Sequence, residues 1–542
     1  MKNNQARLVS KKPVKRLSPF IAAVVFFVAA PQAKAADKGD AFICASTADA
    51  RTLMPMLASD TASAGICGYI FNGLVKYDKD LNLTGDLAER WEVLDGGMQI
   101  VFYLRKGVFW QDGVPFTSRD VDFTYRKMVD PQVRTPYSGD FERVERLETP
   151  DDHTVRVFYK ESFAPALSSW SVSIVPAHLL EKEDLNTSVF SRVPVGTGPY
   201  RFRSWKTQEK IELDANENYF LHRPNIDRVV QRVIPDPSTL FLELQTGGVD
   251  LCGLTPLQYT RQTDTPYFRG EYRKFRLPGD TYVYLGYNLR SPLFSDIRVR
   301  KALNLAVDKD EIIKIVLLGL GTVSTGPFTP QSWAFNSSVK PSPYDPPGAL
   351  RLLKEAGWED SDGDGILDSN GRKFEFTILT NQGNEERIKT AEIIQRRLSD
   401  IGIKVKIKVV EWSVFIGEFV NKRDFDVILL GWALPREPDN YDIWHSSRTR
   451  EGEFNFAGYT NPEVDLLLLE ARRVFDQRKR RELYRKIQEL IYADQPYMFI
   501  YVPDSLYVVH VRFREVVPAA AGIGYNFIDW WVPPAEQKYR MK

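Results

Sequence analysis

The most specific chemical pattern in the chain is an acidic loop at residues 360–368. Its oxygen donors follow the alternating spacing of a calcium-binding loop, and they are Asp360, Asp362, Asp364, the carbonyl of Ile366, and Asp368. The final position, where such loops have a bidentate glutamate, is Gly371. We predict a structural calcium ion here, and the alternative is an Asp/Gly turn that binds no metal.

Signatures of catalysis are scarce. There is no G-x-S-x-G, P-loop or H-E-x-x-H motif, and the five histidines have no Cys, Ser or acidic partner at a diagnostic spacing. The three cysteines form no C-x-x-C pair, so zinc, iron–sulfur and covalent haem sites lack a ligand set. A secreted hydrolase that uses a carboxylate pair is the enzymatic alternative, but no such pair is marked out among the 71 acids. The residues therefore mark out no catalytic site.

Two tryptophans occupy positions suited to ligand contact. Trp412 and Trp432 each end a predicted strand of a β/α region, and ligands bind at the carboxyl ends of strands in such sheets. We predict both as ligand contacts. The alternative is that they pack in the core.

The elements that position these residues change in character near Pro278. Before it strands predominate, with a hairpin turn at 95–97 and a helix that a capping box opens at Thr117 and ends at Met128. Strands are expected at 153–160, 200–205, 210–216 and 226–234.

After Pro278 helices and strands alternate. Helices are expected at 296–319, 350–356, 385–399, 412–421 and 462–494, and strands at 373–380, 403–410, 425–432 and 497–509. The β-α-β-α-β order over 373–432 indicates a parallel sheet with crossover helices.

The first 35 residues have the composition of a secretion signal. They contain seven cations, no acid, an apolar stretch at 20–30 and an A-x-A cleavage site that ends at Ala35. That stretch is too short for a membrane span, which needs about 20 residues, so we predict cleavage after Ala35 over a membrane anchor. The other 507 residues hold 65 cations and 71 acids, and this near balance argues against a nucleic-acid partner.

Export places the cysteines in an oxidising compartment, where thiols tend to pair. Cys44 and Cys252 lie in short apolar runs of strand character, which neighbouring strands could bring together. Cys67 lies in a helical pattern and is predicted to be a buried free thiol.

Several sequence blocks occur in an order that is known from one family. They include FNGLVKY at 71–77, LRKGVFWQDG at 104–113, GTGPYRF at 196–202 and GYTNPEVD at 458–465. Over nearly all of the mature chain, the sequence resembles the extracellular solute-binding proteins of family 5, the oligopeptide/dipeptide/nickel class that serves ABC importers. The resemblance implies a two-lobed α/β Venus-flytrap fold, periplasmic binding protein-like of type II, class C, with an appended domain in the first lobe.

The same resemblance divides the chain into segments. A signal peptide at 1–35 precedes a first lobe built from 36–85, 190–276 and 505–542. The appended domain is 86–189 and the second lobe is 277–504. The crossings near Pro278 and Pro503 are the expected hinges.

The resemblance also implies site residues. In peptide-binding relatives an aspartate shortly after a Gly-Trp pair captures the peptide ammonium. Here the matching position after Trp432 falls at Leu434 or Pro435, which carry no acid, so Glu437 or Asp439 is predicted to substitute.

Two further predictions come from the amino-terminal segment. Residues 45–55 resemble the pocket-lining segment of relatives, which makes Thr47 and Asp49 predicted ligand contacts. Cys44 and Cys252 resemble a disulfide pair that is seen in dipeptide binders.

The function implied is that of a non-enzymatic periplasmic subunit of an ABC importer. It would capture a peptide between two lobes, as a monomer, and deliver it to a permease and its ATPase subunits in the inner membrane. An oligosaccharide, a nickel chelate and a tetrapyrrole are the alternative ligands.

Overall fold

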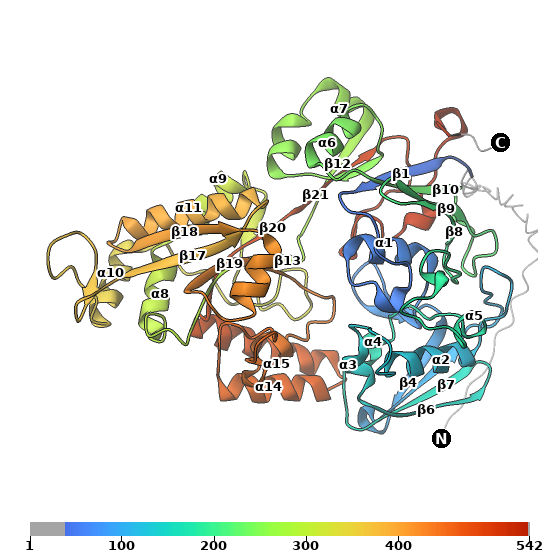
Figure 1. Ribbon diagram of the computed structural model, residues 1–542, viewed down its shortest axis with the longest axis horizontal. Coiled ribbons are helices and arrows are strands. Elements are labelled where there is room, and N and C mark those ends of the chain that lie inside the picture. The colour runs from blue at the N-terminus through green and yellow to red at the C-terminus, as the bar shows by residue number, and fades with distance from the viewer. Residues whose placement is uncertain (1–37, 540–542) are drawn as a thin grey trace, which may run out of the picture. The chain divides into compact units, whose positions relative to one another are not determined.

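Two large β-sheets organise the chain, in a computed structural model that describes residues 38–539 (Figure 1). The predicted signal peptide and its cleavage site lie outside the described residues. The first sheet has seven strands in the order β12 (Tyr272–Leu277), β21 (Ser505–His510), β11 (Leu251–Gly253), β1 (Ala41–Ser46), β10 (Arg228–Val233), β9 (Lys210–Ala215) and β8 (Tyr200–Lys206).

A second, six-stranded sheet has the order β14 (Gly321–Val323), β20 (Tyr497–Pro503), β13 (Thr281–Tyr287), β19 (Val427–Ala433), β17 (Glu375–Asn381) and β18 (Lys404–Val410). Strand β17 runs parallel to β18 and β19, as the β-α-β-α-β order predicts. Strands β13 and β20 are antiparallel to their neighbours, so the complete sheet is mixed.

A third sheet is formed by residues near the start of the chain. It has four antiparallel strands in the order β4 (Ala88–Leu94), β5 (Gln99–Leu104), β7 (Thr154–Tyr159) and β6 (Val144–Asp151). The predicted hairpin is confirmed, since a 3-10 turn at Asp95–Gly97 joins β4 to β5. The predicted capping box is also present, because Thr117 and Asp120 cap helix α2 (Ser118–Met128) reciprocally. Two small ladders pair β2 (Val75–Tyr77) with β3 (Leu83–Gly85), and β15 (Asp368–Ser369) with β16 (Arg372–Lys373).

Helices pack on these sheets. Besides α2 they are α1 (Thr61–Ile70), α3 (Ser138–Phe141), α4 (Ala166–Ser169), α5 (Ala177–Leu180), α6 (Pro237–Gln245), α7 (Pro266–Glu271), α8 (Ile297–Leu305), α9 (Lys309–Val316), α10 (Pro346–Glu355), α11 (Glu385–Ser399), α12 (Trp412–Val414), α13 (Tyr441–Trp444), α14 (Pro462–Arg473) and α15 (Gln477–Asp494). None of the helices within 38–539 is both long and apolar enough to cross a membrane.

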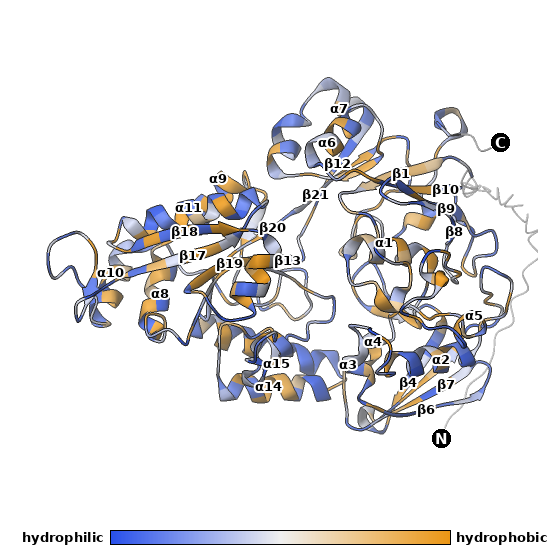
Figure 2. Cartoon of the chain, in the orientation of Figure 1, coloured by the Kyte–Doolittle hydropathy of each residue, from blue (hydrophilic) through white to orange (hydrophobic). Residues whose placement is uncertain are grey.

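The six-stranded sheet is buried on both faces. Along β13, Val283 and Leu285 pack in a core with α8 to α11, whereas Tyr282 and Tyr284 pack in a second core with α13 to α15. This alternation follows from the two-residue period of a strand. Figure 2 shows the result, with hydrophobic residues along the strands and both hydrophobic and hydrophilic residues on α14 and α15. We call the six-stranded sheet with these helices the second lobe, and the seven-stranded and four-stranded sheets with their helices the first lobe.

Several predicted elements are divided in the structure. The helical region 296–319 is two helices, α8 and α9, and 462–494 is α14 and α15, which Asp476 separates by capping the second. Helix α10 begins before 350, because Asp345 caps it and Pro346 fits its first turn. The helix predicted at 412–421 continues from α12 as a π-helical segment, η5 (Phe415–Val420).

The prediction of one strand at 497–509 is wrong. Strand β20 belongs to the second-lobe sheet and β21 to the first-lobe sheet, and Asp504 stands between them. The chain crosses in the other direction between β12 and β13, at residues 278–280. The two crossings lie side by side, because Arg276 pairs with Asp504 at 2.5 Å and a Cβ at Gly279 would collide with the Pro503 carbonyl.

The predicted disulfide between Cys44 and Cys252 is absent, and all three cysteines are buried free thiols. Strands β1 and β11 are indeed neighbours, but Cys44 pairs with Leu251, so Cys252 points to the opposite face of the sheet. Cys44 accordingly packs in the main first-lobe core, and Cys252 packs with Leu244 in a separate cluster.

We expect all three thiols to react when the exported protein is unfolded in alkylating reagent without reductant. Burial raises the pKa of Cys44 and of Cys67 to about 12 and that of Cys252 to about 11, so the folded protein should react slowly. Peptide mapping is the measurement. A single alkylated cysteine in the unfolded protein would show that a bridge forms after all.

Candidate ligand-binding cleft

A cavity of about 950 Å³, the main cavity, has walls from both lobes. The first lobe contributes residues from α1 to β2, from α3 and from α4, and the second lobe contributes the segment after β19 and the end of α14. Its volume lies at the upper end of the range of small-molecule sites. Its polar residues include Asn72, Tyr77, Asp140, Ser169, Glu437 and Arg472.

Five carboxylates line the main cavity, and four of them are held in ion pairs. The pairs are Asp86 with Lys76 at 3.2 Å, Asp439 with Arg472 at 2.7 Å, Asp442 with Arg448 at 3.0 Å, and Glu437 with Arg480. The fifth carboxylate, Asp140, has no ion-pair partner within 38–539 and accepts a hydrogen bond from Ser169 Oγ at 2.5 Å. Burial raises the pKa of Asp140.

Glu437 and Asp439, the acids predicted to bind a ligand ammonium, are both engaged in ion pairs. Both residues line the main cavity, but the guanidinium of an arginine already neutralises each carboxylate. Burial, opposed by the Arg480 charge, raises the pKa of Glu437. A carboxylate that is paired in this way has little unsatisfied charge to offer a ligand ammonium.

A smaller cavity of about 120 Å³, the crossing cavity, adjoins the two chain crossings. It is lined by Leu434 and Pro435, the positions at which the family resemblance implies an acid, and by Leu277, Pro278 and Ser505. Arg436 lines both this cavity and the main one.

An apolar annex of about 190 Å³ shares wall residues with the main cavity, including Tyr137 and Val172. The residues that line the annex alone include Met56, Cys67 and Met128. Flexible thioether side chains adapt to irregular apolar groups, so the annex is suited to an apolar side chain.

The other predicted ligand contacts lie away from these cavities. Trp432 stacks on Phe456 with ring centroids 5.7 Å apart and packs, partly buried, against the second-lobe core. Trp412 is 49% exposed at the start of α12. Asp49 accepts hydrogen bonds from Trp205 Nε1 at 3.1 Å and from the Gln208 amide, and Thr47 is exposed. None of the four lines the main cavity, the crossing cavity or the apolar annex.

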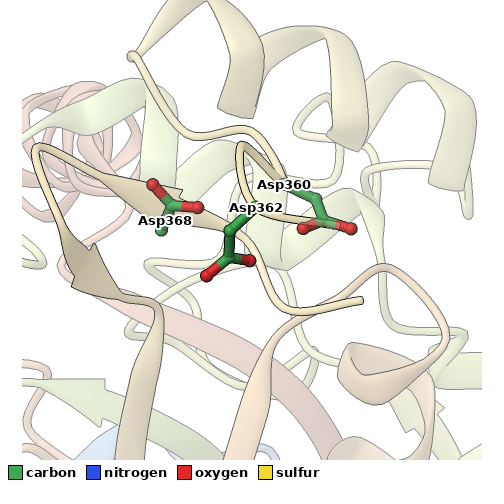
Figure 3. A group of neighbouring side chains, drawn as sticks. All are labelled: Asp360, Asp362 and Asp368. Atoms are coloured by element: carbon green, nitrogen blue, oxygen red, sulfur yellow. The ribbon is translucent and has the colours of Figure 1, made fainter. Parts of the chain in front are cut away.

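The acidic loop brings together three of its predicted ligands (Figure 3). Oxygens of Asp360, Asp362 and Asp368 lie within 4.8 Å of one another, and Asp368 is the first residue of β15. The amine of Lys373 lies 2.6 Å from Asp362 and 2.9 Å from Asp364. Lys373 therefore supplies positive charge where a bound cation would.

If the loop holds calcium, Lys373 and the metal compete for the same carboxylates. We expect calcium at a hundredfold excess over its dissociation constant to stabilise the protein by about 2.7 kcal/mol. Lys373→Met should bind calcium more tightly than wild type, and Asp362→Ala should abolish the response. Thermal unfolding with calcium or with chelator is the measurement, and a melting temperature that is unchanged in wild type and Lys373→Met would make the loop a plain turn.

Sequence reasoning missed Asp140, Arg436 and Arg472. Asp140 lies on a four-residue helix without a motif, and its proximity to the second lobe arises only from folding. Arg436 follows Pro435 in a segment that the sequence did mark out, and a cation next to the position without an acid was the available signal.

Two α/β lobes, two adjacent chain crossings and a polar cavity walled by both lobes define a solute-binding protein of the flytrap type. The chain belongs to the bacterial extracellular solute-binding proteins, family 5, whose middle-region model matches residues 82–453.

Among individual relatives, the oligopeptide-binding protein AppA of Bacillus subtilis is 33% identical over 507 residues, or 91% of this chain and 92% of AppA. The structure of AppA in complex with a nonapeptide matches 92% of this chain and 100% of that chain, with a TM-score of 0.77. NikZ from Campylobacter jejuni, in complex with Ni(L-His), is 29% identical with a TM-score of 0.77 and covers 91% and 99%. DppA from Helicobacter pylori, in complex with the peptide STSA, is 29% identical with a TM-score of 0.75 and covers 92% and 98%.

Proposed function

We propose that this solute-binding protein captures short peptides in the main cavity. The observation that carries the proposal is a wall with hydrogen-bonding groups and charges of both signs, next to an apolar annex. A peptide has the complementary features, namely a polar backbone, ionised ends and apolar side chains. The peptide complexes of AppA and DppA support the same ligand class.

The protein acts by binding and not by catalysis. Four of the five cavity carboxylates are held in ion pairs, which leaves no second free carboxylate at this site for acid–base work. A nickel chelate is the second candidate ligand, because NikZ binds Ni(L-His). No histidine of the described residues lines the main or the crossing cavity, so a chelate would have to bring its own ligands.

Calorimetry on ligand-free protein, obtained by unfolding and refolding, tests this proposal. The titrants are a pool of synthetic tetrapeptides, a pool of oligosaccharides and nickel with excess histidine. We expect saturable heat from the tetrapeptides alone. Binding of only the sugars or only the nickel chelate would refute the peptide assignment.

The biological setting follows the family. We propose export with removal of residues 1–35, monomeric function in the periplasm, and delivery of the ligand to a membrane permease and its ATPase subunits. The lobe boundaries near 277 and 505 are supported by the changes of sheet at 278–280 and at Asp504. Closure of the lobes around the ligand would create the surface that the permease recognises.

A further inference from the structure

The charges on the wall of the main cavity do not cancel completely. Lys76 and Arg472 pair with acids of the same wall, and Glu437 and Asp442 pair with arginines of the second lobe. After these pairs are removed, one anion and one cation are left without an ionic partner among residues 38–539. They are Asp140 of the first lobe and Arg436 of the second lobe.

The carboxylate of Asp140 is available to bind a cationic group of a ligand. Its carboxylate is partly buried, and its hydrogen bond from Ser169 satisfies only one of its oxygens. Burial without a counter-ion disfavours the charged form, which is why its pKa is raised, and a ligand ammonium would remove that penalty. Arg472 and Arg143 lie near enough to affect its pKa, but they pair with Asp439 and Glu161.

The guanidinium of Arg436 is available to bind an anionic group of a ligand. Its guanidinium donates one hydrogen bond, to the Ala521 carbonyl at 3.0 Å, and lies 5.4 Å from the centroid of the Tyr77 ring. A guanidinium has five N–H donors in a planar fork, so most of them stay free for a carboxylate. The side chain is exposed at the junction of the main and crossing cavities.

Both groups belong to one continuous wall. Tyr77 lies next to Arg436, and both line the main cavity together with Ser168. Ser168 precedes Ser169, the hydrogen-bond partner of Asp140. The unpaired anion and the unpaired cation therefore line the same cavity, one on each lobe, with Tyr77, Ser168 and Ser169 on the wall that they share.

We propose that the cavity recognises both ends of a free peptide, with its ammonium at Asp140 and its carboxylate at Arg436. This inference rests on the proposed peptide function and assigns its polarity, with the amino end toward the first lobe. It also explains why no acid is needed at Leu434 and Pro435. A zwitterion would pair the two charges that the protein leaves unpaired, and it would link the lobes.

The test combines two blocked ligands with two variants. The probe is the tetrapeptide pool in free, N-acetylated and C-amidated forms, titrated calorimetrically into wild type, Asp140→Asn and Arg436→Gln. In wild type each blocking group should weaken binding about 10- to 100-fold, the range for a lost charged hydrogen bond. Acetylation should have almost no further effect in Asp140→Asn, and amidation almost none in Arg436→Gln.

The crossed combinations are the internal control. Acetylation should keep its full effect in Arg436→Gln, and amidation should keep its full effect in Asp140→Asn. Asp442→Asn is a matched control, since Asp442 lines the same cavity but pairs with Arg448, and it should preserve both effects.

Two failures are distinguishable. If no form of the pool binds wild type, the proposed peptide function is wrong, and the polarity falls with it. If free peptides bind but acetylation weakens wild type and Asp140→Asn equally, the peptide function stands and the assignment of Asp140 is overturned. If amidation weakens binding to wild type and to Arg436→Gln equally, the assignment of Arg436 to the ligand carboxylate is overturned.

Discussion

Replacing Arg512 by methionine should lower the free energy of unfolding by about 3–5 kcal/mol, the cost of removing one partner from a buried ion pair. Arg512 lies between Asp40 and Asp250, and all three are 1% exposed. Its guanidinium also donates to the Ala41 carbonyl at 3.0 Å. Without it, two buried carboxylates would lose their shared ion-pair partner.

The same cluster connects segments that are distant in sequence. Asp250 accepts the Ile43 amide at 2.8 Å, and Asp40 accepts the Tyr539 amide at 2.8 Å. Loss of Arg512 should therefore loosen the start of β1 together with the carboxy-terminal segment.

Denaturant unfolding, followed by circular dichroism, measures the effect. The matched control is Arg514→Met, which breaks the exposed pair with Glu536 and should cost at most about 1 kcal/mol. Equal stability losses in Arg512→Met and Arg514→Met would contradict the importance of the buried cluster.

Glu437→Gln should have the second largest effect, a loss of about 3 kcal/mol of folding stability. The substitution leaves the guanidinium of Arg480, which is 6% exposed, without its counter-ion. Arg480 would keep its hydrogen bonds to the Tyr484 hydroxyl and the Ala471 carbonyl, at 3.1 Å each, but would lose the negative charge that balances it.

The double variant Glu437→Gln/Arg480→Met removes both charges and should recover much of this loss, because replacing a whole buried pair by apolar atoms is often neutral. Glu482→Gln on the same helix breaks an exposed pair with Arg485 and is the control, with an expected change under about 1 kcal/mol. The measurement is thermal unfolding of wild type, the two single variants and the double variant. If the double variant is no more stable than Glu437→Gln, the unpaired charge of Arg480 is not the cause of the stability loss in Glu437→Gln.

Local structure was predictable where the signal is local. The helix at 385–399 has its predicted bounds because Asn384 caps it and Ala391, Ile394 and Leu398 form one buried stripe. The hairpin at 95–97 follows from its glycines in the same way.

What failed depends on pairing between distant segments. The local strand pattern at 497–509 does not show that β20 and β21 join different sheets, because sheet membership is set by pairing with β13 and β12. Only the family resemblance placed a crossing near Pro503. Likewise, adjacency of β1 and β11 was foreseeable, but the register that separates Cys44 from Cys252 was not. The free charges of Asp140 and Arg436 emerge only once every other cavity charge has found its partner.

The most direct test of the central claim is mass spectrometry of the protein purified from the periplasm without unfolding. Under native conditions we predict a mass above that of the mature chain, and denaturation should release the difference as molecules that fragment at peptide bonds. Released peptides should carry free amino and carboxyl ends. A released ligand without peptide bonds, such as a sugar or a metal chelate, would contradict the assignment of this solute-binding protein to peptides.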